Sequence, residues 1–357
     1  MKILLDIGHP AHVHYFKNLI KLMIGKGHSF LIIARDKEVA HQLLDSYSID
    51  YKSRGSGRKN YFSKIIYMIW VDILLLRLAF KFKPDIFLSF ASPYAAQTSW
   101  LYRKPHISLT DTEHAKIGNL AFIPFSKVVL TPESFLIDLG KKHIKFNSYM
   151  ELSYLHPKYY KPNPQVLKIL GLSQNEKFVL LRFVSWSASH DVGQSGLDDR
   201  TKIELIEKIK KYAKVFISSE SVLPKKFQKY KINISPHQMH DVLSYASLYI
   251  GEGATMASEC AVLGTPAIYI NSLEVGYCSE QEKHYGLLYG FRNSKGVSEK
   301  ALELINTKNL KELHKLRCGN MIDEKIDLTA FLIWFIENYP QSYQVIKKNP
   351  DYQYTFK

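Results

Sequence analysis

Residues 248–270, LYIGEGATMASECAVLGTPAIYI, combine the residue types that bind an anionic ligand. An apolar run leads into Gly251 and Gly253, and glycines permit a tight turn and the close approach of a ligand to the backbone. The helix that follows begins with unpaired N–H groups, and these groups and the helix dipole favour negative charge. The stretch therefore predicts a phosphate-sized site at the carboxyl end of a strand. Further contacts are expected from the first helical residues, Ala254, Thr255 and Met256.

Glu259 lies about one helical turn beyond Thr255, on the same face of this helix. A carboxylate at that position suits hydrogen bonds from ribose hydroxyls and does not suit the binding of phosphate. The combination predicts a nucleotide rather than a free phosphate. In the alternative interpretation the glycines only close a turn, and Glu259 is a solvated surface acid.

Three histidines in GHPAHVH follow the first apolar run, at the edge where a doubly wound domain presents its ligands. Histidine titrates near neutral pH, so one of them could take a proton from an acceptor hydroxyl. His9 is the first choice for this general base, and His12 is the second. A metal site is the alternative, but no acidic cluster follows at a recognisable spacing, so we expect none. The third histidine, His14, and the other two could also serve only to pack the loop.

The motif LTDTEHAK places Asp111 and Glu113 at the end of another predicted strand of the first half. Either carboxylate is a rival general base. In the alternative interpretation Asp111 is the N-cap of the next helix.

The motif LLRFVSWSASHD ends the first strand of the second half. Arg182 could neutralise the charge that builds on a departing diphosphate, and Trp186 could stack on a base or a sugar. Ser219 and Glu220 close the next strand, on the same expected edge. Arg182 and Trp186 could instead be packing residues.

Short apolar runs alternate with helical patterns in both halves of the chain, which is typical of parallel sheets covered by helices. In the first half, Asp36 is expected to cap a helix around residues 39–44. The segment YYKPNP, residues 159–164, is the best candidate for a linker. The strands are expected at 2–6, 29–34, 86–90, 106–110 and 127–131, and then at 178–183, 215–220, 232–236, 248–250 and 267–270.

The length of 357 residues exceeds what one hydrophobic core usually organises, so two domains are expected. The sequence predicts an N-terminal Rossmann-like domain over 1–162 and a second over 163–325. Residues 326–357 are predicted to form a C-terminal helix and tail that pack back on the first domain, although an interface helix would look the same. The fold class is therefore α/β, with two doubly wound parallel-sheet domains facing a central cleft.

The chain carries 48 Lys and Arg against 33 Asp and Glu, and this charge of +15 favours an anionic partner. No zinc-finger, RNA-recognition or helix-turn-helix pattern is present, so nucleic acid is not the expected partner. Three cysteines at wide spacings argue against disulfides and against a zinc site. The N-terminus turns polar after a few apolar residues, unlike a secretory signal, so a cytoplasmic location is expected.

Residues 65–80, IIYMIWVDILLLRLAF, are apolar except for Asp72 and Arg77. The segment is shorter than the roughly 20 residues that a membrane-spanning helix needs, so no span is expected. Its flanks are basic, which suits a helix lying on an anionic membrane, so residues 58–83 are a candidate for peripheral membrane contact. A buried helix of the first domain explains the same pattern.

The chain resembles the uncharacterised family DUF354 through DIGHPAHVHYFKNLI, LTDTEHAK, ELSYLHP, LLRFVSWSASHD and GEGATMASE. Residues 235–270 also resemble the donor half of glycosyltransferases of the GT-B fold, and of the non-hydrolysing UDP-N-acetylglucosamine 2-epimerases that share this fold. The resemblance implies nucleoside contact for Ser258 and Glu259, and diphosphate contact for the turn from Gly251 to Thr255. It also implies donor-sugar contact for Glu280 and Gln281. Glu252 would bring a negative charge to the phosphate position, so we expect its side chain to point away or to meet a sugar hydroxyl.

The sequence and the resemblance together predict a GT-B glycosyltransferase without a cofactor. Its second domain would bind a nucleotide-diphosphate sugar, UDP-linked by the resemblance, and its first domain a sugar or lipid-linked acceptor of cell-envelope polysaccharide synthesis. One alternative is a sugar-nucleotide epimerase, which needs no acceptor. A second alternative is a non-enzymatic protein that binds nucleotides or polyanions.

Overall fold

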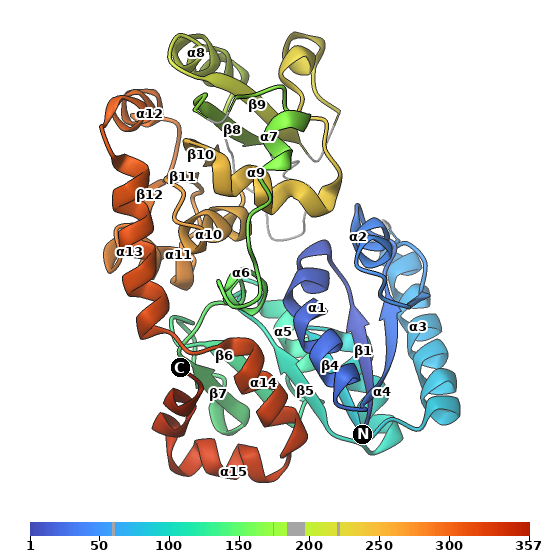
Figure 1. The fold of residues 1–357 in the computed structure, drawn as a ribbon. Helices are drawn as coiled ribbons and strands as arrows, with labels where there is room; N and C mark the ends of the chain where they lie inside the picture. The colour runs from blue at the N-terminus through green and yellow to red at the C-terminus, as the bar shows by residue number, and fades with distance from the viewer. Residues whose placement is uncertain (59–60, 174, 184–196, 220–221) are drawn as a thin grey trace. The chain divides into compact units, whose positions relative to one another are not determined.

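The computed structural model divides the chain into two compact units (Figure 1). Unit 1 comprises Met1–Tyr154 together with Lys325–Lys357, and unit 2 comprises Leu155–Glu324. The structure describes residues 1–58, 61–173, 175–183, 197–219 and 222–357.

Unit 1 contains a parallel sheet with the strand order β3-β2-β1-β4-β5-β6-β7 in the part of the chain that is described. The central strands β1 and β4 are almost entirely buried, as expected for parallel strands covered on both faces. The register pairs Asp6, near the end of β1, with Ile33 of β2 and Ser89 of β4. The strands are β1 (Lys2–Ile7), β2 (Ser29–Ala34), β3 (Lys52–Ser53), β4 (Ile86–Phe90), β5 (His106–Leu109), β6 (Val128–Pro132) and β7 (His143–Phe146).

Helices cover both faces of this sheet. The strand order reverses direction at β1, so right-handed crossovers place α1 and α2 on one face and α3, α4 and α5 on the other. In agreement, α1 packs against α2 and α14, whereas α4 packs against α3 and α5. The helices are α1 (Pro10–Gly25), α2 (Ala40–Ser46), α3 (Tyr61–Phe82), α4 (Pro93–Tyr102), α5 (Lys116–Phe122), the 3-10 turn η1 (Gly140–Lys142) and α6 (Leu152–Leu155).

The C-terminal segment of unit 1 begins with α14 (Leu328–Glu337) and continues with α15 (Gln341–Lys348) and the 3-10 helix η4 (Pro350–Phe356). Asp327 caps α14 by accepting a hydrogen bond from the Ala330 N–H. Thr329 donates to the Ser153 carbonyl and Phe331 packs near Phe146, so α14 completes the core of this unit.

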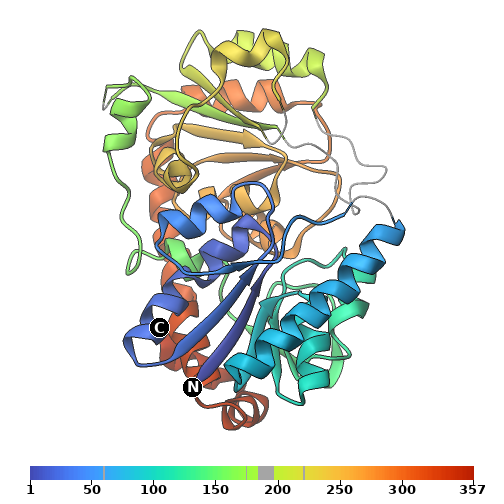
Figure 2. The same cartoon turned by 90° about the vertical axis from the view of Figure 1, so that its right-hand side faces the viewer.

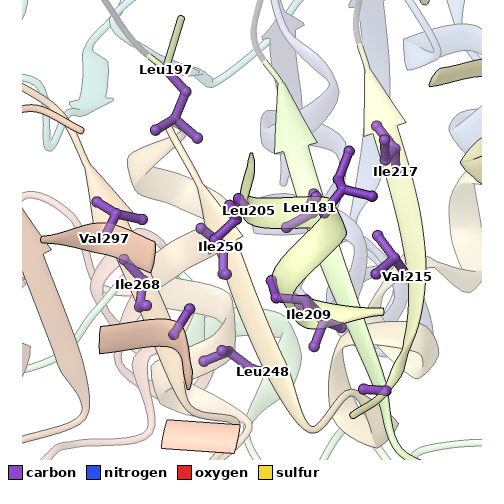
Figure 3. Packing of buried hydrophobic residues seen from close by; sticks show 14 of the residues in the cluster. Leu181, Leu197, Leu205, Ile209, Val215, Ile217, Leu248, Ile250, Ile268 and Val297 are labelled. Atoms are coloured by element: carbon purple, nitrogen blue, oxygen red, sulfur yellow. The ribbon is translucent and has the colours of Figure 1, made fainter. Parts of the chain in front are cut away.

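Unit 2 contains a second parallel sheet, with the order β12-β11-β10-β8-β9 among the described residues. Its core lies between this sheet and helices α8 and α12, and Figure 3 shows Leu205 and Ile209 of α8 beside Leu181 of β8. The strands are β8 (Phe178–Phe183), β9 (Lys214–Ser219), β10 (Leu248–Gly251), β11 (Ala267–Ile270) and β12 (Leu288–Phe291). The helices are α7 (Gln165–Ile169), α8 (Asp199–Ile209), the 3-10 turns η2 (Lys225–Tyr230) and η3 (Pro236–Gln238), α9 (Met239–Tyr245), α10 (Ala254–Val262), α11 (Gly276–Lys283), α12 (Val297–Asn306) and α13 (Leu310–Glu324).

The structure differs from the sequence expectations at the predicted linker. Residues 159–164 belong to unit 2. Along the chain, unit 1 ends at Tyr154 and unit 2 begins at Leu155, so the boundary is not at residue 162. The Tyr160 hydroxyl and the Asn163 N–H both donate to Asp241 of α9, so this proline-rich stretch is anchored to unit 2.

Two local predictions were wrong. Asp36 does not cap α2, because its N–H donates to the Gly55 carbonyl and the helix starts only after Val39, which provides no side-chain cap. Residues 232–236 do not form a strand. Only an isolated bridge joins Lys231 to Ile217, and Pro236 then starts a 3-10 turn.

Candidate functional site

The glycine-rich turn of unit 2 lies between β10 and α10. An ideal Cβ atom on Gly251 would lie 2.1 Å from the Tyr249 hydroxyl oxygen and 3.0 Å from the Arg182 Cβ atom, so only glycine fits there. Gly253 has extended backbone angles, and no side chain among the described residues caps α10. Within the described part of the chain, the first N–H groups of α10, at Ala254, Thr255 and Met256, have no side-chain cap. This arrangement suits an anion.

Glu252 is buried within the turn, and one of its carboxylate oxygens accepts a hydrogen bond of 2.6 Å from the Leu197 N–H. The side chain thus holds the segment that leads into α8. This contact gives Glu252 a structural role in unit 2.

Behind the first turn of α10, two side chains are fixed by buried hydrogen bonds. The Ser258 hydroxyl accepts from the Gln281 amide of α11 at 2.8 Å, and both residues are fully buried. The Gln281 Oε1 atom has no hydrogen-bond partner in the described structure. The structure therefore brings together two residues that the sequence placed at a nucleotide site, and it leaves a buried acceptor next to them.

Glu259 accepts a hydrogen bond of 2.9 Å from the His240 ring of α9. Both side chains are almost fully buried, so this contact fixes the orientation of the carboxylate. Sequence reasoning missed His240, which lies 19 residues before Glu259 and is brought to it only by the packing of α9 against α10. Its presence in the stretch that resembles glycosyltransferases was the available signal.

Arg182 lies directly beside the turn, because the sheet register pairs it with Gly251. Its guanidinium donates to the Ser218 hydroxyl of β9 at 2.7 Å. Ser219, the next residue of β9, pairs with Phe183, so it lies one position further along the same edge. Glu280 precedes Gln281 on α11 and is half-buried. Trp186 and Glu220 lie outside the described residues.

In unit 1, His9 and His12 both lie at the end of β1, and both use Nδ1 to accept a backbone hydrogen bond. The Ala11 N–H donates to His9 at 3.2 Å, and the Gly8 N–H donates to His12 at 3.3 Å. An Nδ1 atom that accepts leaves the proton on Nε2 in the neutral ring. Burial, followed by the charge of His9, lowers the pKa of His12 well below its usual range. Near neutral pH the His12 ring therefore presents an Nε2–H donor, and in both histidines a backbone N–H already engages the Nδ1 atom.

His14 lies on α1 and contacts the Tyr47 hydroxyl at 3.2 Å. Among the residues that the structure describes, no group of three histidine, cysteine, aspartate or glutamate side chains is placed to hold a metal ion.

Asp111 and Glu113 follow β5 and are both buried. Burial raises the pKa of Asp111 to about 7, and the Thr112 hydroxyl donates to its carboxylate at 3.1 Å. Asp111 does not cap a helix, because α5 begins at Lys116 with Ala115 as its N-cap. A carboxyl group with a pKa near neutrality is suited to general acid–base chemistry. Since β4 separates β1 from β5 in the sheet, the histidines and these carboxyl groups lie two strands apart, about 10 Å.

A second polar group at the end of β1 was not foreseen from the sequence. Asp6 and Arg54 are almost fully buried and form an ion pair, with 2.9 Å between Arg54 Nε and Asp6 Oδ1. The Ser92 hydroxyl also donates to Asp6, and the Tyr67 hydroxyl contacts Arg54 at 3.0 Å. A buried ion pair with further hydrogen bonds therefore lies at the carboxyl end of the central strand β1 in unit 1.

Several solved structures have a fold similar to that of this chain. The Staphylococcus aureus protein MnaA in complex with UDP has a TM-score of 0.67 at 12% identity, covering 96% of this chain and 97% of that one. The UDP-GlcNAc 2-epimerase of Neisseria meningitidis bound to UDP-GlcNAc has a TM-score of 0.65 at 14% identity, covering 88% and 94%. The Streptomyces glycosyltransferase SsfS6 has a TM-score of 0.59 at 12% identity, covering 95% and 100%. At these identities the likeness shows the fold, which is the two-domain α/β architecture of GT-B glycosyltransferases and UDP-GlcNAc 2-epimerases, as the sequence predicted.

One relative in sequence is the uncharacterized protein MJ0665 of Methanocaldococcus jannaschii. It is 25% identical over 281 residues, which cover 75% of this chain and 81% of the relative. Residues 1–322 also match the family described as "Protein of unknown function (DUF354)". The resemblance seen in the sequence motifs is thereby confirmed, and the chain belongs to the DUF354 family.

Proposed function

We propose that this protein is a glycosyltransferase that binds a nucleoside-diphosphate sugar, UDP-linked, in unit 2 and transfers the sugar to an acceptor hydroxyl held by unit 1. The observation that carries the proposal is the uncapped start of α10 behind Gly251 and Gly253, with Glu259 fixed by His240. A diphosphate fits the first feature because unpaired N–H groups favour anions. A ribose fits the second, because a carboxylate accepts hydrogen bonds from two hydroxyls.

Arg182 has the role of stabilising the leaving diphosphate. It pairs with Gly251 in the sheet register and so lies beside the proposed phosphate position. A cation placed there in advance opposes the charge that develops as the glycosidic bond breaks, and it costs no reorganisation during the reaction. Ser218 supports this role by holding the guanidinium.

Asp111 is the proposed general base. Its buried position and its pKa of about 7 suit proton transfer near neutral pH. His9 and His12 are less suited, because their Nδ1 atoms already accept backbone hydrogen bonds. We therefore assign the histidines to donate hydrogen bonds to the acceptor, which replaces the sequence-based preference for His9 as the base.

The second candidate function is epimerisation of a UDP-sugar. The observation that favours it is the pair of buried acids, Asp111 and Glu113, because an epimerase needs both an acid and a base around one sugar. The UDP-GlcNAc 2-epimerase of Neisseria meningitidis also has a higher TM-score than the SsfS6 glycosyltransferase.

One experiment separates the two functions. Purified protein is incubated with a panel of UDP-sugars, with and without acceptor sugars and polyprenyl phosphates, and nucleotide products are resolved by chromatography. The transferase proposal expects UDP release that depends on an acceptor. An isomerised UDP-sugar formed without an acceptor would instead establish the epimerase.

The variant Asp111→Asn tests the assignment of the base. Removal of a general base is expected to lower kcat/KM by about 10²–10⁴. Glu303→Gln is the matched control, because Glu303 is an exposed acid that pairs with Lys300 on α12, a helix to which no site residue is assigned. Equal activity of both variants would contradict the role of Asp111.

A further inference from the structure

Helix α3 of unit 1 is apolar on both sides. Its inner side packs on the sheet through Tyr67, Val71, Leu75 and Ala79. Its outer side exposes Ile66 (69%), Ile69 (53%), Trp70 (49%), Ile73 (45%) and Phe80 (63%). Figure 2 shows α3, in light blue, running along the outside of unit 1. A helix that faces water normally has polar residues on its outer side. The apolar outer side of α3 is therefore suited to contact with an apolar partner.

The apolar surface continues across the neighbouring helices. α3 packs against α4, whose Trp100 and Leu101 are 61% and 53% exposed, and α4 packs against α5, whose Leu120 is 72% exposed. The Phe80 ring lies 5.2 Å from the Tyr102 ring, which joins α3 to α4 at this surface. We call the eight exposed residues the outer face: Ile66, Ile69, Trp70, Ile73, Phe80, Trp100, Leu101 and Leu120.

Exposed cations accompany this apolar surface, and almost no acids do. Along α3, α4 and α5 the sequence contains one acidic residue, Asp72. Asp72 is half-buried, and burial raises its pKa to about 7, which reduces its negative charge near neutral pH. Asp85, which follows α3, accepts a hydrogen bond from the Lys2 N–H. The exposed cations on these helices and the segments next to them include Lys64, Arg77, Lys81, Lys83, Arg103 and Lys104.

A cavity of about 560 Å³ opens at one end of the outer face. Ile66 and Trp70 belong to the outer face and also line this cavity, and Arg58 lines it too. Arg58 is exposed, so the cavity has an apolar wall beside an accessible cation. This combination suits a group with a negative charge attached to a hydrocarbon.

We propose that the outer face of α3, α4 and α5 binds the surface of an anionic lipid bilayer. Apolar side chains flanked by lysine and arginine enter the boundary between headgroups and acyl chains, while the cations attract anionic lipids. A second copy of the chain is a less suitable partner, because a symmetric dimer through this face would bring its cations close to their own copies. In the described parts of the chain no helix is long and apolar enough to cross a membrane, so contact through this face would be peripheral.

The test is flotation with liposomes of phosphatidylcholine alone and of equimolar phosphatidylcholine and phosphatidylglycerol. We expect the full chain to float with the anionic vesicles, weakly or not at all with the neutral ones, and less at high salt. The variant Ile66→Ser/Trp70→Ser should bind at least about tenfold more weakly, because two apolar side chains no longer enter the bilayer. The variant Lys81→Glu/Lys83→Glu should bind at least about 25-fold more weakly, since each cation near an anionic surface contributes about fivefold and the substitution also reverses both charges.

Matched controls are available in unit 2 and at the C-terminus. Leu313→Ser/Leu316→Ser removes two exposed apolar residues of α13, and Lys347→Glu/Lys348→Glu changes the same charge on α15. Both should float like the wild type. Thermal melting of every variant checks folding. The proposal is overturned if the wild type does not float with anionic vesicles, if the controls lose binding equally, or if light scattering shows a dimer that Ile66→Ser/Trp70→Ser separates.

Discussion

The two units have the same architecture but differ at the edges where their sheets end. In unit 2 the end of β10 leads into the uncapped start of α10, and behind it lies the buried Gln281 Oε1 atom, which has no partner in the described structure. In unit 1 the centre of the edge is closed, because Asp6 and Arg54 neutralise each other. The same sheet edge thus carries an uncapped helix start in unit 2 and a buried ion pair in unit 1.

The two edges differ in how far apart in the sequence their residues lie. The site of unit 2 lies mainly within β10 and α10, so a short stretch of sequence sets its geometry. The edge of unit 1 joins Asp6 of β1 to Arg54 after β3 and Ser92 after β4. Its acid–base candidate, Asp111, is on yet another strand. The following variants test whether the first edge binds and the second edge supports.

The largest expected effect on stability is that of Asp6→Ala. The substitution leaves the buried Arg54 guanidinium without its counter-charge, which typically costs about 3–5 kcal/mol. Urea unfolding measures the loss. As a control, Glu337→Gln removes a partly exposed acid that pairs with Lys26, and it should cost at most about 1 kcal/mol. A similar, small loss for both variants would contradict a supporting role for the edge of unit 1.

In unit 2, Gly251→Ala should cost about 3 kcal/mol, because the new methyl group would overlap the Tyr249 hydroxyl. It should also weaken nucleotide binding, because the displaced turn supports α10. Gly319→Ala in α13 is the control, since an added Cβ atom meets nothing within 4 Å there and helix propensity improves. If Gly251→Ala is as stable as Gly319→Ala, the close packing beneath the turn is not as described.

The pH dependence of stability should differ between Asp111→Asn and the wild type by up to about 4 kcal/mol, because a pKa rise of about three units corresponds to about 1.4 kcal/mol per unit. The pKa of Asp111 is raised by burial to about 7 in the folded chain, whereas an unfolded aspartate titrates near about 4. Wild-type stability from this group is therefore complete below about pH 4 and is lost as the pH rises to about 7. Asparagine does not titrate, so the variant should gain relative to the wild type over this range. Unfolding curves from pH 4 to pH 8 measure the gain, and a constant difference would contradict the raised pKa.

The smallest effect is expected for His240→Ala. His240 is a positioning residue, because it holds Glu259 without belonging to the predicted contact set. We expect about tenfold weaker nucleotide binding by calorimetry, in line with the loss of a residue that orients a ligating group. His240→Gln can still donate to the carboxylate and should recover part of the affinity. If His240→Ala binds nucleotide as tightly as the wild type, or if His240→Gln recovers no affinity, His240 does not position Glu259 for binding.

Much of the fold could be predicted from the sequence, because the alternation of apolar runs with helical patterns is a local property. The strand–helix–strand segment from Leu248 to Ile270 could be predicted from the two glycines of its turn and from Gly264. This last glycine has the left-handed backbone angles expected at a helix end. The anchoring of Tyr160 by Asp241 could not be predicted, because prolines signal a break without saying what fixes it.

The site could be predicted only where it is local. Ser258 and Glu259 stand out because they follow a glycine-rich turn, whereas His240 and Gln281 reach them through helix packing. The sequence identifies the histidines as candidates but does not show which ring nitrogen accepts a hydrogen bond. The backbone hydrogen bonds to His9 and His12 therefore changed their proposed role.

We propose that unit 2 binds a nucleoside diphosphate. The most direct test is thermal unfolding of the wild type and of Glu259→Ala with UDP, ADP, GDP and their sugar conjugates, with Glu303→Ala on α12 as the control. A ligand at about 100 times its Kd stabilises the folded state by about 2.7 kcal/mol. We predict a saturable rise in Tm with UDP and UDP-sugars that the control retains and Glu259→Ala loses. The absence of a shift with every nucleotide, or an equal shift in Glu259→Ala, would contradict the account.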